Sequence, residues 1–139
     1  MLIGEAAQRS GIPAHTIRFY ERRKLVSRAT RLPSGYRVYS DRVLDELRFI
    51  RRAQRLGLTL EETREILSLG RAGRRPCERV AAICDAHLAE IDRKMAELQA
   101  FRQHLQEAKR LTERDCGFTH EGFCRAIFSE DLASQRPLV

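Results

Sequence analysis

The segment 76–113 constrains the fold of this chain more than any other stretch. After Pro76 it contains no further proline and no glycine, and its apolar or small residues are alternately four and three positions apart. This spacing predicts one continuous helix, roughly 55 Å long, with a narrow heptad stripe that Arg102 interrupts. The stripe consists of Cys84, Leu88, Ile91, Met95, Leu98 and Leu105.

The length of the chain decides how this stripe can be covered. A chain of 139 residues is too small to bury so long a helix in its own core. We therefore expect the helix to pair with a second copy of itself, parallel or antiparallel. The alternative is a helix folded back onto the remaining residues, which would leave much of the stripe exposed.

The charge of the chain is divided unevenly along its length. Residues 1–75 contain 17 lysines and arginines against 8 acidic residues, whereas residues 76–139 contain 9 against 11. A polyanion such as nucleic acid suits the first part, although a solvated basic surface without a partner is the alternative. No apolar run approaches the about 18 residues of a membrane span, so we expect a cytoplasmic chain without a membrane partner.

The first 40 residues predict two short helices followed by a hairpin. The break at 10–13, with a glycine and a proline, separates the two helices in the manner of a helix-turn-helix. The Pro-Ser-Gly sequence at 33–35 is a turn signal, and 36–39 alternates as a strand does. These patterns predict a short β-hairpin, or wing, with at least one of Tyr36 and Tyr39 packed beneath it.

Two further helices are expected before the long one. The first covers about 41–56, with Ser40 as its candidate cap and Leu56 facing inward. Thr59 and Glu62 have the spacing of a capping box, which predicts the start of a helix that reaches about Gly70.

Three motifs resemble the MerR family of transcription regulators in order and spacing. They are Leu-Ile-Gly-Glu-Ala-Ala at 2–7, Thr-Ile-Arg-Phe-Tyr-Glu at 16–21 and Gly-Tyr-Arg-Val-Tyr at 35–39. The resemblance implies a winged helix-turn-helix, an antiparallel coiled-coil homodimer and a non-enzymatic regulator of a promoter with an overlong spacer. Activators of this family distort the DNA when the effector is bound, which makes the promoter usable by RNA polymerase.

The resemblance also implies which residues contact DNA and how the chain is divided. Groove contacts and DNA deformability supply specificity, while phosphate contacts set register and affinity. His15 also fits an uninvolved surface position, and Phe19 is assigned to the core. The implied DNA contacts are His15, Thr16, Arg18 and Tyr20 in the second helix and Arg31, Tyr36 and Arg37 in the wing. The mainly α chain is expected to comprise a winged helix-turn-helix DNA-binding domain (1–70), a hinge (71–76), a coiled-coil dimerisation helix (77–113), a metal-sensing loop with a short helix (114–128) and a tail (129–139).

All four cysteines lie in the second half of the chain, where metal binding or redox sensing is the natural interpretation in a reducing compartment. Cys116 and Cys124 enclose a glycine-containing loop with His120 between them. The loop lies just beyond the long helix, where the resemblance implies the sensing loop of metal-responsive members. Cys77 begins the long helix, whose dipole favours a thiolate there, and in an antiparallel dimer it would complete the site of the partner chain.

Two features indicate different metals. Cys77 resembles members that sense divalent ions, whereas the seven-residue gap between Cys116 and Cys124 resembles the copper(I) type. We give Cys77 the greater weight, because a linear two-thiolate site does not need it. The predicted effectors are Hg, Pb and Cd, or Zn if His120 completes a Cys₃His set.

The sequence also contains other candidate ligands and allows alternative functions. Asp115 is a candidate oxygen ligand for a second ion, Cys84 is assigned to a small buried thiol of the stripe, and His87 and His104 are assigned to ordinary helix positions. A redox switch, in which Cys116 and Cys124 form a disulfide, is the alternative outside metal sensing. A zinc hydrolase is disfavoured, because no general base lies beside the thiol loop.

Overall fold

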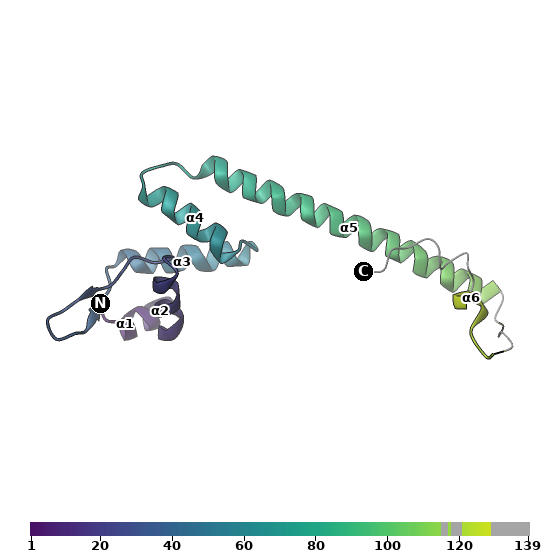
Figure 1. Ribbon diagram of the computed structural model, residues 1–139, viewed down its shortest axis with the longest axis horizontal. Coiled ribbons are helices and arrows are strands. Elements are labelled where there is room, and N and C mark those ends of the chain that lie inside the picture. Colours follow the sequence, from purple (N-terminus) through teal and green to yellow (C-terminus); the bar gives the residue numbers. More distant parts are fainter. Residues whose placement is uncertain (115–116, 118–120, 129–139) are drawn as a thin grey trace. The chain divides into compact units, whose positions relative to one another are not determined.

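The computed structural model describes residues 1–114, 117 and 121–128, and these are mainly helical (Figure 1). Their contacts form two compact units, Met1–Asp85 and a second unit from Ala86 onward. The elements are α1 (Ile3–Ser10), α2 (Ala14–Arg22), β1 (Thr30–Arg31), β2 (Arg37–Val38), α3 (Arg42–Arg55), α4 (Leu60–Arg71), α5 (Cys77–Arg114) and α6 (Arg125–Phe128). Among the described residues, no helix is both long enough and apolar enough to cross a membrane.

The predicted helix-turn-helix is present in α1 and α2. Gly11 ends α1 in the left-handed region, at a φ of 71°, and donates its backbone N–H to the carbonyl of Ala7. This conformation suits glycine, because a side chain would be strained there. Pro13 has an extended backbone and immediately precedes α2. It is therefore the cap residue before the helix and not part of the first helical turn.

The predicted wing is also present. Strands β1 and β2 pair antiparallel, with Thr30 opposite Val38, and the turn between them contains Gly35 at a φ of 89°. Tyr39 is 1% exposed, whereas Tyr36 is exposed on the hairpin. One of the two tyrosines therefore packs beneath the wing, as the sequence predicts.

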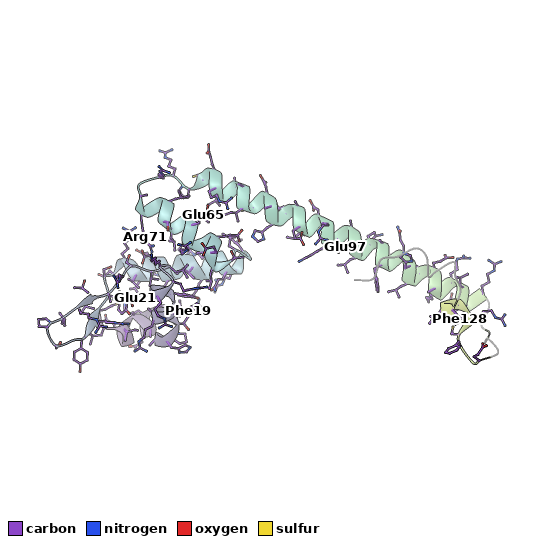
Figure 2. All side chains as sticks on the ribbon, in the orientation of Figure 1. Phe19, Glu21, Glu65, Arg71, Glu97 and Phe128 are labelled. Atoms are coloured by element: carbon purple, nitrogen blue, oxygen red, sulfur yellow. The ribbon has the colours of Figure 1, made fainter. Side chains whose placement is uncertain are left out.

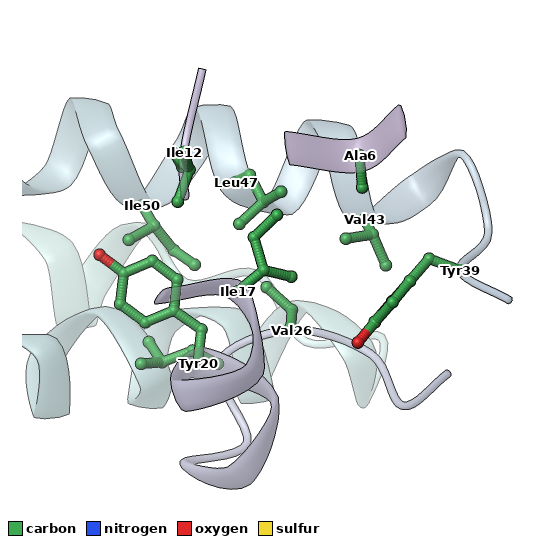
Figure 3. Packing of buried hydrophobic residues seen from close by; sticks show 10 residues of the cluster. Ala6, Ile12, Ile17, Tyr20, Val26, Tyr39, Val43, Leu47 and Ile50 are labelled. Carbon is green, nitrogen blue, oxygen red and sulfur yellow. The ribbon is translucent and has the colours of Figure 1, made fainter. Parts of the chain in front are cut away.

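The core of the first unit lies where α1, α2, α3 and the wing meet. Figure 3 shows Ile17 in the middle of this cluster, with Tyr20 and Tyr39 towards its opposite ends. Helix α3 contributes residues at helical spacing, which gives it one continuous buried face. The buried members are Ala6, Ile12, Ile17, Tyr20, Leu25, Val26, Tyr39, Val43, Leu47 and Ile50.

Two local expectations for α3 were wrong. Leu56 is 75% exposed, because it follows the last residue of the helix and no longer shares its buried face. Ser40 does not cap the helix with its side chain. Asp41 occupies the cap position, and Ser40 only accepts the Val43 N–H with its backbone carbonyl, at 3.1 Å.

Helix α4 begins at the predicted capping box. The Glu62 N–H donates to Thr59 Oγ1 at 3.1 Å, and the Thr59 N–H donates to Glu62 Oε1 at 2.8 Å. Each of two unpaired backbone donors at the start of the helix is thereby satisfied.

The first turns of α5 belong to the N-terminal unit. Arg79 forms a two-pronged ion pair with Glu65 of α4, with Nε–Oε1 and Nη2–Oε2 distances of 2.7 and 3.1 Å. Ile83, one turn further on, is fully buried. The compact first unit therefore extends to Asp85, while residues 72–76, within the expected hinge, connect α4 to α5.

The predicted long helix is confirmed, since α5 is continuous over 38 residues. Beyond Asp85, each of the five remaining members of the stripe is more than half exposed. These members are Leu88, Ile91, Met95, Leu98 and Leu105. Arginine–glutamate pairs line other positions of the helix, for example Arg93 with Glu90 and Glu97.

Candidate functional site

A basic groove runs between the helix-turn-helix and the wing. Its volume is about 790 Å³, and it contains four arginines against the single carboxylate of Glu5. Guanidinium groups hold phosphate oxygens through two parallel hydrogen bonds, so this lining suits a polyanion. The groove is lined by Leu2, Ile3, Gly4, Glu5, Arg18, Arg22, Arg31, Gly35, Tyr36 and Arg37.

The periodicity of α2 explains how its polar residues reach this groove. Ile17 and Tyr20 are three positions apart and share the buried face. His15, Arg18 and Arg22 follow one another at spacings of three and four, and all three are exposed. Of the other residues that sequence analysis assigned to DNA, Thr16 is half-buried, while Arg31 and Tyr36 are exposed.

The structure corrects the orientation of two aromatic residues of α2. Tyr20, expected to point towards DNA, is 6% exposed and belongs to the core. Phe19, expected in the core, is 37% exposed, and the guanidinium of Arg23 lies 5.7 Å from the centre of its ring. The cause is helical geometry, because Phe19 is only two positions from Ile17 and so lies on another face.

Glu21 fixes the wing against α2. The Tyr39 hydroxyl donates to Glu21 Oε2 at 2.7 Å, and the Ala29 N–H donates to Glu21 Oε1 at 3.2 Å. Arg37 of the wing lies 3.7 Å from the same carboxylate. Burial, followed by the hydrogen bond to Glu21, raises the pKa of Tyr39. Glu21 belongs to the motif at 16–21, but no pattern in the sequence predicts this role.

A second buried carboxylate, Glu46 of α3, ties the loop after α2 to the end of α4. Glu46 is 4% exposed and accepts from the Ser27 N–H at 2.7 Å and the Ser27 hydroxyl at 2.8 Å. Arg71 donates to it at 3.0 Å and also to the carbonyls of Lys24 and Leu25, at 3.1 and 2.7 Å. Arg71 therefore lies close to the loop that follows α2, although it ends α4 (Figure 2). This network was also missed.

The candidate metal ligands are only partly within the described residues. Cys77 is the first residue of α5, and both it and Cys124 are exposed free thiols. Cys116, His120 and Asp115 lie outside the described residues. Among the residues that are described, no three Cys, His, Asp or Glu side chains gather closely enough to hold an ion. The ligand set therefore stays a prediction.

The remaining cysteine and histidines lie along α5. Cys84, expected as a small buried thiol, is a half-buried free thiol. His87 and His104 are also half-buried in the helix.

The short helix α6 closes the described part of the C-terminal segment. The Arg125 N–H donates to the Gly117 carbonyl at 3.0 Å. The guanidinium of Arg125 also lies close to Gly117, where a Cβ atom would be 3.0 Å from its Cζ. The rings of Phe123 and Phe128 stack with their centres 5.6 Å apart on either side of Cys124 in sequence. The hydrogen bond to Gly117 thus ties Arg125, the residue after Cys124, to a residue that precedes Cys124 in the sequence.

A helix-turn-helix followed by a two-stranded hairpin defines the winged helix-turn-helix class of proteins. Within that class, the chain belongs to the MerR family. Residues 1–69 match the family model described as MerR HTH family regulatory protein, and residues 44–108 match the model described as MerR, DNA binding.

Relatives and solved structures agree with this assignment. A heavy metal-dependent transcription regulator of Rhizobium meliloti is 42% identical, over 76% of this chain and 72% of its own length. An HTH-type transcriptional regulator of Pseudomonas aeruginosa is 40% identical, over 96% and 97% of the two chains. The transcription regulator PbrR691 from Ralstonia metallidurans, solved in complex with lead(II), is 34% identical, with a TM-score of 0.69 over 88% of this chain and 94% of that one. The family consists of transcription regulators rather than enzymes.

Proposed function

We propose that this chain is a homodimeric transcription regulator that binds promoter DNA and responds to a divalent thiophilic metal, namely Hg, Zn, Cd or Pb. The observation that carries the proposal is the arginine-lined groove between α2 and the wing. The buried core and the bond from Tyr39 to Glu21 hold α2 and the wing in place, and Arg37 lies 3.7 Å from Glu21. Such a regulator acts in the cytoplasm, on the promoter that RNA polymerase uses.

The DNA contacts of the proposal come from exposed and half-buried residues of the wing and of α2. The arginines hold the phosphate backbone, and α2 presents its outer face to the edges of the bases. Tyr20 is not included, because it supports α2 from within the core. The proposed contacts are His15, Thr16 and Arg18 of α2 and Arg31, Tyr36 and Arg37 of the wing.

Pairing with a second copy is supported by the uncovered stripe of α5. Five large apolar side chains along one helix, each more than half exposed, would be costly to leave in water. A second α5 offers the same stripe at the same spacing, which is how coiled coils bury such residues.

The proposed metal site combines Cys77 of one chain with Cys116 and Cys124 of its partner, and with His120 if the metal is zinc. Thiolates prefer soft metals, which suits mercury, lead and cadmium. Both described cysteines of this set are exposed and free to ligate. The names of the relatives support the class of effector, since one is a heavy metal-dependent regulator and another was solved with lead(II).

Serine substitution at Cys77 tests the metal site. Metals are titrated into the reduced protein, and transcription from the promoter that it binds is measured with salts of Hg, Pb, Cd, Zn, Cu and Ag. Cys77→Ser should abolish the divalent response while DNA binding persists, and the control Cys84→Ser should respond as the wild type does. An unchanged response of Cys77→Ser would remove Cys77 from the site.

The same titration separates the two alternatives. A response to copper(I) alone that does not need Cys77 would indicate the copper(I)-type sensor. A potential-dependent disulfide, without tight metal binding by the reduced protein, would indicate the redox switch.

Alanine substitution at Arg37 tests the DNA-binding groove. Arg37→Ala should weaken binding to duplex DNA and reduce the slope of log K against log salt by about one for each subunit of the dimer. Arg48→Ala is the matched control, because it removes one charge from an exposed pair with Asp45 outside the groove. Equal affinities for wild type and Arg37→Ala would mean that the wing does not touch the backbone.

A further inference from the structure

The loop that follows α2 contains an unusual backbone conformation. Lys24 has a φ of 60°, and among the described residues it is the only one other than glycine with a positive φ. The Leu25 N–H donates to the Tyr20 carbonyl at 2.8 Å, and the Lys24 N–H donates to the Glu21 carbonyl at 3.0 Å. These two bonds form a Schellman motif at the end of α2, with Lys24 at the left-handed position that glycine usually occupies.

The surroundings of Lys24 hold it in this conformation. Arg71 donates to the carbonyls of both Lys24 and Leu25, which adds two hydrogen bonds to those of the Schellman motif. Glycine would adopt the same backbone without steric strain. A strained residue that its neighbours hold in place points to a function for its side chain.

The side chain of Lys24 lines a second basic groove, of about 800 Å³. Two of the five cations there are already engaged, Arg71 with Glu46 and Arg37 with Glu21. The side chains of Arg22, Lys24 and Arg28 are exposed, and within the described residues no ion pair or hydrogen bond involves them. The groove is lined by Glu21, Arg22, Lys24, Val26, Ser27, Arg28, Arg37 and Arg71.

The two basic grooves are neighbours that share two lining residues. Arg22 at the end of α2 and Arg37 of the wing line both of them. The positive surface therefore runs from the first groove past the end of α2 into the second. A partner that fits needs negative charge repeated over a distance longer than one groove, and a DNA strand carries one phosphate at every nucleotide.

We propose that the second groove binds the phosphate backbone of the DNA beyond the stretch held by α2 and the wing, with Lys24 supplying a phosphate contact. This inference rests on the proposed function, since it extends the same interface. Lys24 thereby adds affinity that does not depend on base sequence, because phosphates are common to all sequences.

Replacing Lys24 in two ways separates the charge from the backbone. Lys24→Gly removes the charge and relieves the strain, whereas Lys24→Gln removes the charge and retains the strain. Both should bind a random-sequence duplex of about 40 base pairs roughly three- to tenfold more weakly, with a salt slope lower by about one for each subunit of the dimer. Only Lys24→Gly should also raise the melting temperature, by about 2–4 °C. In Lys24→Gly, the affinity for the duplex should therefore fall while the melting temperature rises.

The outcomes distinguish this inference from the proposed function. If the wild-type dimer does not bind the duplex, the proposed function fails. If the wild type binds and both variants match it in affinity and salt slope, only the second groove is overturned. Weaker binding by Lys24→Gly but not by Lys24→Gln would also overturn it, because the backbone and not the charge would then be responsible.

Two controls complete the experiment. Arg48→Ala removes one charge elsewhere in the same unit and should leave the salt slope unchanged. Inorganic phosphate, titrated by calorimetry, tests for a small-anion site. Phosphate binding that Lys24→Gln abolishes while duplex binding stays intact would overturn the assignment to DNA.

Discussion

The N-terminal unit and the part of α5 beyond Asp85 differ in the exposure of their large apolar residues. In the first unit, Ile17, Leu47 and Ile50 are completely buried among residues of four elements. In α5, Leu88 and Leu98 are at the same kind of regular helical spacing, yet both lie largely in water. Helical periodicity therefore identifies which face of a helix is apolar enough to be buried. It does not show whether that face is buried by the same chain or by a second one.

The two regions also differ in how they use charge. The first unit buries Glu46 among hydrogen-bond donors, whereas the ion pairs of α5, such as Arg93 with Glu97, lie on its surface. Buried carboxylates need partners to remain charged, and surface pairs contribute little. The first unit is therefore expected to depend on individual polar contacts, and α5 on the partner helix proposed for it.

The largest expected effect comes from placing a charge in the α5 stripe. Leu98→Glu should raise the dissociation constant of the dimer at least about a hundredfold, because the carboxylate would be buried without a partner in both copies. Sedimentation equilibrium measures this change. Circular dichroism and binding of the isolated chain to DNA would show whether the first unit remains folded.

Gln99→Glu is the control for that prediction. It adds the same charge one position further along, at an exposed residue off the stripe, and should leave the dimer intact. A monomeric wild type, or equal dissociation of both variants, would remove the difference between the two regions.

The next effect compares a buried ion pair with an exposed one. Arg71→Ala leaves Glu46 buried without its main cation, which should lower the free energy of unfolding by about 2–3 kcal/mol. Arg79→Ala breaks the pair with Glu65, both of whose side chains are more than two-fifths exposed, and should cost much less. Urea denaturation measures both, and equal losses would contradict the contrast.

The smallest effect concerns Tyr39 and its dependence on pH. At neutral pH, Tyr39→Phe should lower stability by about 1 kcal/mol, because the hydrogen bond to Glu21 is lost. The pKa of Tyr39 is raised in the folded protein above its ordinary value of 10.0, so the unfolded chain loses this proton first. The wild type should therefore lose stability as the pH rises from about 10 through the folded pKa, while Tyr39→Phe should not lose this part.

Urea midpoints of the two proteins, measured across this pH range, test the prediction. The other two tyrosines are present in both proteins, so their ionisation cancels in the difference. Parallel curves would show that Tyr39 does not retain its proton in the folded state.

Several elements could be predicted because their signals are local. The capping box of Thr59 and Glu62, the Pro-Ser-Gly turn of the wing and the unbroken helix after Pro76 each depend on residues a few positions apart. Physical interactions over such short distances act before the rest of the fold is present.

The faces of α2 show an error that periodicity could have prevented. Ile17 and Tyr20 share a face at a spacing of three, so Tyr20 belongs inward and Phe19 does not. The motif resemblance places this stretch near DNA as a whole and does not distinguish its inward from its outward residues.

Other features depend on contacts that sequence order does not reveal. Glu46 and Arg71 are 25 positions apart, and no pattern in the chain pairs them. Lys24 adopts a conformation for which the sequence offers no glycine signal. The metal site needs a second copy of the chain under the proposed arrangement, so a single chain could indicate only its cysteines.

The contacts of Arg79 and Ile83 have a consequence for protein engineering. A chimaera that exchanges the C-terminal segment at residue 76 would cut the Arg79–Glu65 pair and uncover Ile83, whereas a junction after Asp85 would keep both. With the junction after Asp85, Cys77 would remain in the N-terminal unit and would not be exchanged with the C-terminal segment. In such a chimaera, Cys77 would come from one protein and the other proposed metal ligands from the second. The preference among metals would then depend on residues of both proteins.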